Sequence, residues 1–353
     1  MSSQRTQHIE TDNHEIILYT TEEDTMSTTS QSQAQNVTSD QKKLHLIGVG
    51  VGHSIAPLMH NYICRSLNKP WNFVATEAPD MEAVMKIMKA PDFAGAVVTM
   101  PYKKTVMSHL DGLDPLAVKL GACNNVYITS DGKLQGTNTD WRGIKGCLLA
   151  GGDKGLNKPA MIVGAGGASR AAVYALAVEL KCPVIYVVNR DDQEVQDLIT
   201  DTRSLLSVPG STESLCKIVH IQSIDQARSL PVPQYIVGTV PDSAPTTGPE
   251  KMAIAIFNYY LASAEEQGVF LDMCFKPRVT RKIKLARSYG WSTVEGTEII
   301  GHQIQEQYRV WISPKSEEGV ISPQLAHEAW ATLRAAADES KGINYEVDDL
   351  VIE

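Results

Sequence analysis

The stretch that decides the fold is residues 160–180, AMIVGAGGASRAAVYALAVEL. It holds a short apolar run, then a turn with three glycines, then an alanine-rich segment that favours a helix. Glycine lets the backbone turn tightly and approach an anion, and the N-terminus of the following helix offers free N–H groups and a positive dipole. The order of strand, glycine turn and helix therefore predicts a unit that binds the pyrophosphate of a dinucleotide.

The next predicted strand, residues 184–188, ends at four polar residues, where the adenosine ribose of a dinucleotide would lie. A carboxylate there accepts hydrogen bonds from the ribose 2′-hydroxyl and repels a 2′-phosphate, whereas an arginine attracts the phosphate. Two aspartates beside one arginine favour NAD and leave NADP open, and one of the aspartates could be only a helix N-cap. The expected cofactor contacts are Gly164, Ala165, Gly166, Gly167, Ala168, Asn189, Arg190, Asp191 and Asp192.

Outward from this unit, short β-rich runs alternate with helical patterns, which predicts an α/β protein with mainly parallel sheets. Ser130, Asp131 and Gly132 separate two β-rich runs and predict a hairpin. Helices are expected to begin at Pro57, after Asp80, and at residues 299 and 323. The predicted strands are residues 44–49, 96–99, 161–163, 184–188, 235–238 and 269–273.

Composition excludes several classes of protein. The chain has 353 residues, and 32 Lys and Arg against 41 Asp and Glu give a net charge of −9, which argues against a nucleic-acid partner. No apolar run approaches the roughly 20 residues that cross a bilayer, so we predict a cytoplasmic protein with no membrane partner. The six cysteines lack a CxxC pair, which favours reduced thiols and predicts no metal site.

Both ends of the chain differ in composition from its middle. Residues 1–43 are rich in Ser, Thr and Gln and offer too little apolar surface to fold, so we predict a disordered tail. Residues 339–353 form an acidic tail, and its end from Tyr345 to Glu353 is also expected to fray. The ordered protein is therefore expected between these two tails.

Polar clusters precede the glycine turn. They lie at His53 and Ser54, at residues 99–104, at Asn124 and Asn125, and at residues 138–140. Oxidation of a secondary alcohol needs a hydride acceptor, which a nicotinamide supplies, and a group that takes the hydroxyl proton. Lys103 could take the proton and Asp140 could hold the ammonium in place, although singly they also fit a solvated lysine and a helix N-cap.

These clusters resemble elements of the shikimate dehydrogenase family. HSIAP at residues 53–57, followed by His60 and Asn61, is similar to HSxSPxxHN, and VTMPYK at 98–103 is similar to NVTxPxK. GACN at 121–124 resembles GAxNT, and GTNTD at 136–140 resembles GxNTD. The resemblance extends in order from residue 44 to residue 336.

The resemblance implies a fold, a reaction and a set of site residues. Residues 44–145 would form an N-terminal α/β substrate-binding domain completed by the C-terminal helices at 297–338, and residues 146–296 would form a Rossmann-like NAD(P)-binding domain. Lys103 and Asp140 would be the catalytic dyad. The small-molecule substrate, a hydroxylated cyclohexane carboxylate, would be bound by Ser54, Thr99, Asn124 and Gln303. The oligomeric state is not predicted.

Four departures bear on the substrate. Ala56, Val97, Asn125 and Phe275 replace the serine, asparagine, threonine and tyrosine of the family pattern. Ala56 and Phe275 remove hydroxyls that the family uses against the substrate carboxylate, a loss of about 1.5–3 kcal/mol for each hydrogen bond to a charged group. The stretch from Ser54 to Pro57 is more similar to fungal quinate dehydrogenases, and a smaller Ala56 would leave room for the extra hydroxyl of quinate.

Two functional hypotheses follow. The preferred one is NAD(P)-dependent oxidation of quinate to the 3-dehydro ketone, with shikimate left open as a second substrate. The alternative is a sensor that binds a metabolite of the shikimate pathway without turning it over, which the presence of both Lys103 and Asp140 disfavours. Residues 242–267 are longer than the family needs and predict an additional helix for packing or a subunit contact. His53 and His60 fit structural roles as well as substrate contacts.

Overall fold

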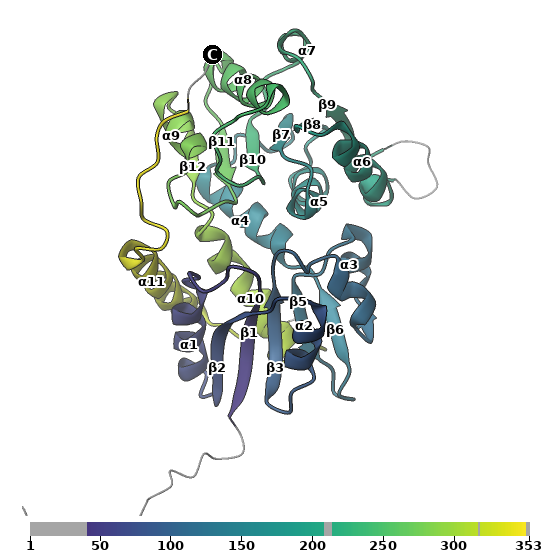
Figure 1. The fold of residues 1–353 in the computed structure, drawn as a ribbon, viewed down its shortest axis with the longest axis vertical. Helices are drawn as coiled ribbons and strands as arrows, with labels where there is room; N and C mark the ends of the chain where they lie inside the picture. The colour runs from purple at the N-terminus through teal and green to yellow at the C-terminus, as the bar shows by residue number, and fades with distance from the viewer. Residues whose placement is uncertain (1–40, 208–213, 317, 351–353) are drawn as a thin grey trace, which may run out of the picture. The chain divides into compact units, whose positions relative to one another are not determined.

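A computed structural model of the chain describes residues 41–207, 214–316 and 318–350 (Figure 1). Two six-stranded sheets form its framework. The first sheet has the strand order β2-β1-β3-β5-β6-β4, and the second has the order β12-β11-β10-β7-β8-β9. Among the described strands the pairing is parallel except where β5 pairs with its two neighbours, so the predicted α/β class with mainly parallel sheets is confirmed.

The first sheet brings three chain segments to one edge. Parallel strands β1 and β3 end at this edge, while β5 runs the opposite way and begins there. Val97 pairs with Asn125, and Asn125 pairs with Thr137, so the end of β3, the start of β5 and the end of β6 are neighbours. The strands are β1 (Lys42–Gly48), β2 (Trp71–Glu77), β3 (Phe93–Val98), β4 (Gly112–Leu113), β5 (Asn125–Ile128) and β6 (Leu134–Thr137).

Helices cover both faces of the first sheet. Successive strand residues point to opposite sides of a sheet, and the apolar residues on each side of this one pack against helices. Leu44 packs with the apolar sides of α1 (Ala56–Ser66), α10 (Glu298–Ile312) and α11 (Pro323–Glu339). Ile47 packs on the other face with residues of α2 (Met81–Met88) and of the short helix η1 (Thr105–His109). The C-terminal helices therefore complete the core of a sheet formed early in the chain.

The second sheet is entirely parallel and has the Rossmann strand order. Its central strands are buried on both faces, since Ile162 packs into one core and its neighbour Met161 into the other. The order reverses between β7 and β10, which is where such sheets bind ligands at the carboxyl ends of their strands. The strands are β7 (Ala160–Val163), β8 (Val184–Val188), β9 (Lys217–His220), β10 (Tyr235–Gly238), β11 (Val269–Asp272) and β12 (Ser292–Val294).

The remaining helices lie around the second sheet or lead into it. The predicted additional helix is present as α8, and it begins with a capping box between Thr247 and Glu250. The alanine-rich helix after the glycine turn runs as α5 and continues in a π-helical turn, η2. These elements are α3 (Pro115–Leu120), α4 (Asp140–Gly151), α5 (Gly167–Tyr174), η2 (Ala175–Glu179), α6 (Asp192–Leu206), α7 (Ile224–Arg228), α8 (Gly248–Ser263) and α9 (Arg281–Ser288).

The tail predictions need correction. Strand β1 begins at Lys42, two residues inside the predicted tail 1–43, and residues 1–40 lie outside the described part of the chain. The tail predicted at 339–353 begins too early, because Glu339 ends α11 and Ile343 is fully buried. Arg278 N also donates to the Ile343 carbonyl at 2.8 Å. Residues 351–353 are not described.

Among the described residues there is no helix long and apolar enough to cross a bilayer.

Candidate active site

Lys103 and Asp140 form an ion pair. Lys103 Nζ donates to Asp140 Oδ2 at 2.6 Å, and the two side chains are 19% and 7% exposed. The carboxylate is therefore buried, while part of the lysine remains reachable from solvent. An ammonium held in this way can exchange a proton with a hydroxyl bound beside it.

Backbone pairing at the edge of the first sheet places Lys103. It lies in the turn that follows β3, and its carbonyl accepts a hydrogen bond from Cys123 N at 2.8 Å. Asn124 extends β5 backwards, because its carbonyl accepts from Val98 N at 2.8 Å and its N–H donates to Thr137 O at 3.1 Å. The sheet register therefore fixes Lys103 beside Asn124.

Asp140 is the first residue of α4, and Thr139 is the N-cap. The interpretation of Asp140 as an N-cap is therefore wrong. Its N–H donates to Asn138 Oδ1 at 3.0 Å, and Asn138 Nδ2 donates to Ala122 O at 2.9 Å. Since Asn138 holds the start of the helix, the Asp140 carboxylate is left to bind side chains.

A buried polar network fixes the orientation of that carboxylate. Asn124 Nδ2 lies 2.8 Å from Asp140 Oδ1, 3.1 Å from Thr139 Oγ1 and 3.0 Å from Gln303 Oε1. Thr139 N donates to Asn124 Oδ1 at 2.7 Å, and Thr139 Oγ1 donates to Gln303 Oε1 at 2.6 Å. Both carboxylate oxygens of Asp140 therefore accept a hydrogen bond. Helix α10 supplies Gln303, which lies 163 residues after Asp140 in the chain.

The structure thus brings together Lys103, Asp140, Asn124 and Gln303 from the predicted set. Thr139 belongs to the same network but was missing from the predicted contacts, although its place between Asn138 and Asp140 in a polar cluster was a signal for it.

Ser54 and Thr99 lie on the segments that follow β1 and β3 rather than inside this network. Thr99 N donates to Ile47 O at 2.9 Å, and Ser54 Oγ accepts from Ala56 N at 3.3 Å. Both side chains are half-buried. Because β1 and β3 are parallel neighbours, both segments leave the sheet at the edge where Lys103 lies.

Glu77 shapes the loop that carries Ser54. Its carboxylate accepts from Gly50 N at 2.7 Å and from Gly52 N at 3.0 Å. These bonds lower the pKa of Glu77, and the hydrogen bond from Gly50 N has the largest effect. No sequence pattern pointed to this residue, because it lies in a strand that the sequence did not predict.

Of the four residues that depart from the family pattern, Ala56 and Asn125 are buried, and Val97 and Phe275 are half-buried. Ala56 is buried in the first turn of α1, and Phe275 is half-buried with its ring centroid 5.9 Å from that of His53. His60 is buried and stacks on Phe73 with ring centroids 4.1 Å apart. His60 is therefore a core residue, and His53 remains half-buried beside Phe275.

The glycine turn has the geometry that a dinucleotide needs. Gly164 has φ +118°, a conformation that disfavours residues with a Cβ, and a Cβ there would collide with Thr239 and Val240. A Cβ on Gly166 or Gly167 would meet nothing within 4 Å, so the N-terminus of α5 is open to a ligand. The residues present therefore fit a pyrophosphate at this turn.

The end of β8 is organised by the start of α6. Asp191 is the N-cap, and its Oδ1 accepts from Gln193 N at 2.8 Å and from Glu194 N at 3.1 Å. Arg190 Nη1 donates to Glu250 Oε1 at 2.7 Å. The N-cap interpretation therefore holds for Asp191, while Asp192 is an exposed residue in the first turn.

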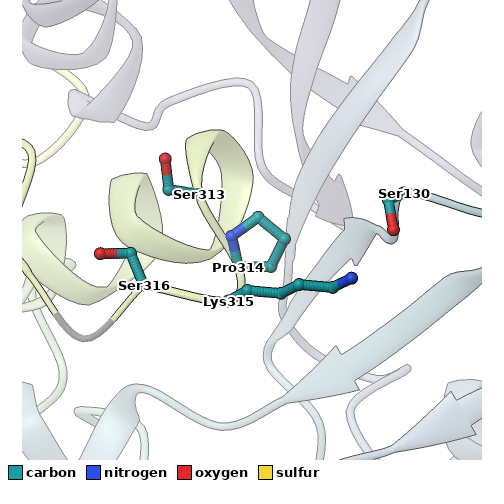
Figure 2. Close-up of a pocket in the computed structure, with 5 residues that line it drawn as sticks. All are labelled: Ser130, Ser313, Pro314, Lys315 and Ser316. Atoms are coloured by element: carbon teal, nitrogen blue, oxygen red, sulfur yellow. The ribbon is translucent and has the colours of Figure 1, made fainter.

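Figure 2 shows a surface pocket elsewhere on the molecule. Its lining residues are Ser130, Ser313, Pro314, Lys315 and Ser316. None of these residues belongs to the Lys103 network or to the glycine turn, and we assign it no role in the reaction.

Comparison with known proteins gives consistent results. A model described as the shikimate dehydrogenase substrate binding domain matches residues 46–126. A quinate dehydrogenase from Emericella nidulans is 32% identical over 309 residues, which covers 81% of this chain and 92% of that protein. A pentafunctional AROM polypeptide from Eremothecium gossypii is 34% identical over 291 residues, and this match covers 81% of this chain but only 18% of the AROM polypeptide.

Among solved structures, the chain is similar to a shikimate 5-dehydrogenase from Thermus thermophilus, which was crystallised with NADP(H) and shikimate. The two share 26% sequence identity with a TM-score of 0.62, and the match covers 84% of this chain and 99% of the other.

Proposed function

Since this chain belongs to the shikimate and quinate dehydrogenase family, we propose that it oxidises quinate, and also shikimate, to the 3-dehydro ketone with NAD or NADP. The observation that carries the proposal is the Lys103–Asp140 pair, held by the buried amides of Asn124 and Gln303. A protein that only binds a metabolite has no need of a proton-transfer lysine, so this pair favours catalysis over the sensor hypothesis.

We propose that the first sheet and its helices bind the substrate and that the second sheet and its helices bind the dinucleotide. Residues 44–145 with the helices at 297–338 would bind the substrate, because they supply the ion pair and Gln303. Residues 146–296 would bind the dinucleotide, with the pyrophosphate on residues 164–168 and the ribose near residues 189–192. The Rossmann strand order and the open start of α5 support this assignment.

The proposed reaction is a hydride transfer coupled to a proton transfer. NAD or NADP, when bound, supplies the nicotinamide that accepts the hydride from the carbon bearing the reacting hydroxyl. Lys103 Nζ receives the hydroxyl proton as the free amine and returns it as the ammonium in the reverse direction. Asp140 holds Nζ through one carboxylate oxygen, while its other oxygen stays fixed by Asn124, so the lysine is oriented before the substrate arrives.

We propose quinate as the preferred substrate because of Ala56. Quinate differs from shikimate by a hydroxyl on the carbon that bears the carboxylate, and alanine takes less space there than serine. Ser54 and Thr99 are the hydroxyl-bearing side chains that we assign to substrate binding on this side of the site.

The direct test is to monitor formation of reduced cofactor with quinate and with shikimate, each under NAD and under NADP. We expect turnover of quinate with at least one cofactor. Binding of quinate without turnover under all four conditions would support the sensor instead, and turnover of shikimate alone would contradict the argument from Ala56.

Substitution of the ion pair provides the second test. In Lys103→Ala and Asp140→Asn we expect kcat to fall by about 10²–10⁴, the usual size of a lost acid–base contribution, with little change in the dissociation constant for NAD. Lys104→Ala is the matched control, because Lys104 is the adjacent lysine, is exposed, and should retain normal turnover. Near-normal kcat in both variants of the pair would remove it from the mechanism.

A further inference from the structure

An ion pair joins the expected ribose end of the nucleotide sheet to the additional helix α8. Arg190 lies just beyond β8, and its Nη1 donates to Glu250 Oε1 at 2.7 Å across 60 residues of sequence. The Arg190 side chain is 66% exposed and that of Glu250 is 22% exposed. The arginine is therefore in contact with solvent, while the glutamate is set into the protein.

Glu250 is fixed by bonds that do not involve Arg190. Its Oε2 accepts from Thr246 N at 2.9 Å, from Thr246 Oγ1 at 3.0 Å and from Thr247 N at 3.0 Å. Thr247 Oγ1 in turn accepts from Glu250 N, which completes the capping box of α8. These donors lower the pKa of Glu250, the Thr246 N–H most strongly, so Oε1 is held as a charged acceptor.

This preorganisation distinguishes the pair from an ordinary surface ion pair. A pair of two mobile, exposed side chains contributes little to stability, in part because both must be ordered to form it. Here three hydrogen bonds from the protein already order Glu250, so only Arg190 loses freedom. Glu250 also has the largest effect in raising the pKa of Arg190.

We propose that Glu250 is a coenzyme-specificity residue, which favours NAD over NADP by holding Arg190 in an ion pair. A guanidinium bound to a carboxylate has fewer N–H groups for a 2′-phosphate, and the nearby carboxylate repels that phosphate within a Debye length of about 8 Å. The neutral 2′-hydroxyl of NAD is affected by neither. The inference rests on the proposed function, because it places the dinucleotide at residues 164–168.

Asp191 does not hydrogen-bond the Arg190 guanidinium, although its charge and that of Glu194 also act on it. Both of its capping bonds use Oδ1, and Asn189 Nδ2 lies 2.9 Å from the Asp191 carbonyl and 2.8 Å from Glu194 Oε2. These bonds order the turn after β8 without involving the Arg190 guanidinium. The carboxylate that hydrogen-bonds the guanidinium therefore comes from α8, which gives the long segment at 242–267 a role beyond packing.

The test is direct binding of NAD and of NADP to the full chain, measured by calorimetry without substrate. In Glu250→Gln, which keeps the side-chain length and one acceptor oxygen for the cap, we expect NADP affinity to rise about tenfold, equal to about 1.4 kcal/mol, while NAD affinity changes less than about twofold. Glu266→Gln is the control for net charge, because Glu266 lies beyond the far end of α8 and should leave the ratio unchanged.

A double-mutant cycle separates the pair from other effects of the substitution. Arg190→Ala alone should change NADP affinity little, since its guanidinium is already paired, but in the Glu250→Gln background it should abolish the gain. An unchanged NADP to NAD ratio in Glu250→Gln, or a gain that persists in the double variant, overturns the proposal. Normal coenzyme binding without quinate or shikimate turnover would refute the proposed function and leave this test intact, whereas failure of both coenzymes to bind would refute both.

Discussion

At the scale of single residues, His60 shows how an apparent site residue serves the core. It is fully enclosed, stacks on Phe73, and its Nδ1 lies 3.4 Å from the hydroxyl of Tyr308. Burial lowers the pKa of His60 to about 3. The side chain is therefore neutral in the folded protein at any pH where the enzyme would work, and it contributes shape and apolar contact.

This burial predicts a pH dependence of stability. The unfolded chain binds a proton at His60 near pH 6.5 and the folded chain only near pH 3, so the unfolded state holds more protons between these values. The free energy of unfolding should therefore be fully retained above pH 6.5 and decline as pH falls below it, by about 1.4 kcal/mol per pH unit at most. Urea unfolding across pH 7.5 to 4.5 measures this decline.

His60→Phe isolates the contribution. Phenylalanine keeps an aromatic ring against Phe73 but cannot take up a proton, so the variant should lose less stability than the parent between pH 6.5 and 4.5. His45, whose pKa burial lowers to about 4, is present in both proteins and cancels in the difference. Parallel curves for parent and variant would show that His60 does not cause the decline.

At the scale of elements, the sequence predicts those strands and turns whose formation depends on the residues within them. The six predicted strands are all present. Four of them lie in the second sheet, where they are buried on both faces and therefore appear in the sequence as continuous apolar runs. Strands β2, β4, β9 and β12 were missed. All four lie at sheet edges, where exposed residues such as Asn72 and Lys217 interrupt the pattern. The hairpin was found because its turn residues, Ser130 to Gly132, have a specific backbone role.

The residues of the site also divide into those that local sequence reveals and those that only the folded structure brings together. The polar cluster at Asn138 and Asp140 was visible in the sequence because its members are adjacent. The bonds from Asn124 to Gln303 and from Arg190 to Glu250 depend on tertiary packing, which no local pattern encodes. Gln303 could be assigned only through a family resemblance. For Glu250 the sequence predicted only that it lies in an additional helix.

Close packing of α4 on α10 predicts the effect of a small substitution. A Cβ at Gly143 would lie 3.1 Å from the Ile299 carbonyl oxygen and 3.3 Å from Gln303 Cγ. Gly143→Ala gains about 1 kcal/mol in helix propensity but should lose about 1–3 kcal/mol through overpacking. Because α4 starts with Asp140 and α10 carries Gln303, we expect both the thermal midpoint and kcat to fall.

Gly248→Ala is the matched control for this prediction. Gly248 begins α8, and a Cβ there meets nothing within 4 Å apart from its two chain neighbours, so alanine should leave kcat unchanged. If Gly143→Ala instead raised the thermal midpoint with full activity, helix propensity alone would account for the result, and the helices would not be as tightly packed as the structure shows.

At the scale of the whole molecule, the C-terminal segment joins elements from distant parts of the chain. The Ile343 side chain lies in the core formed by α1, α10 and α11, while its carbonyl accepts from Arg278 N. Arg278 also pairs with Glu295 at 2.5 Å and with Asp338 at 2.6 Å. Arg278 lies between β11 and α9 of the second sheet, so this segment connects the C-terminal helices to that sheet.

The last prediction follows from this connection. Ile343→Ala should lower the free energy of unfolding by about 2–5 kcal/mol, because it removes a fully buried side chain and leaves a cavity. Tyr345→Ala, two residues on and 47% exposed, is the control and should change it by less than about 0.5 kcal/mol. Urea unfolding of both variants decides the matter. Equal midpoints for Ile343→Ala and the parent would mean that the segment after α11 frays in solution. A loss confined to Ile343→Ala would show that the buried isoleucine holds this segment on the core.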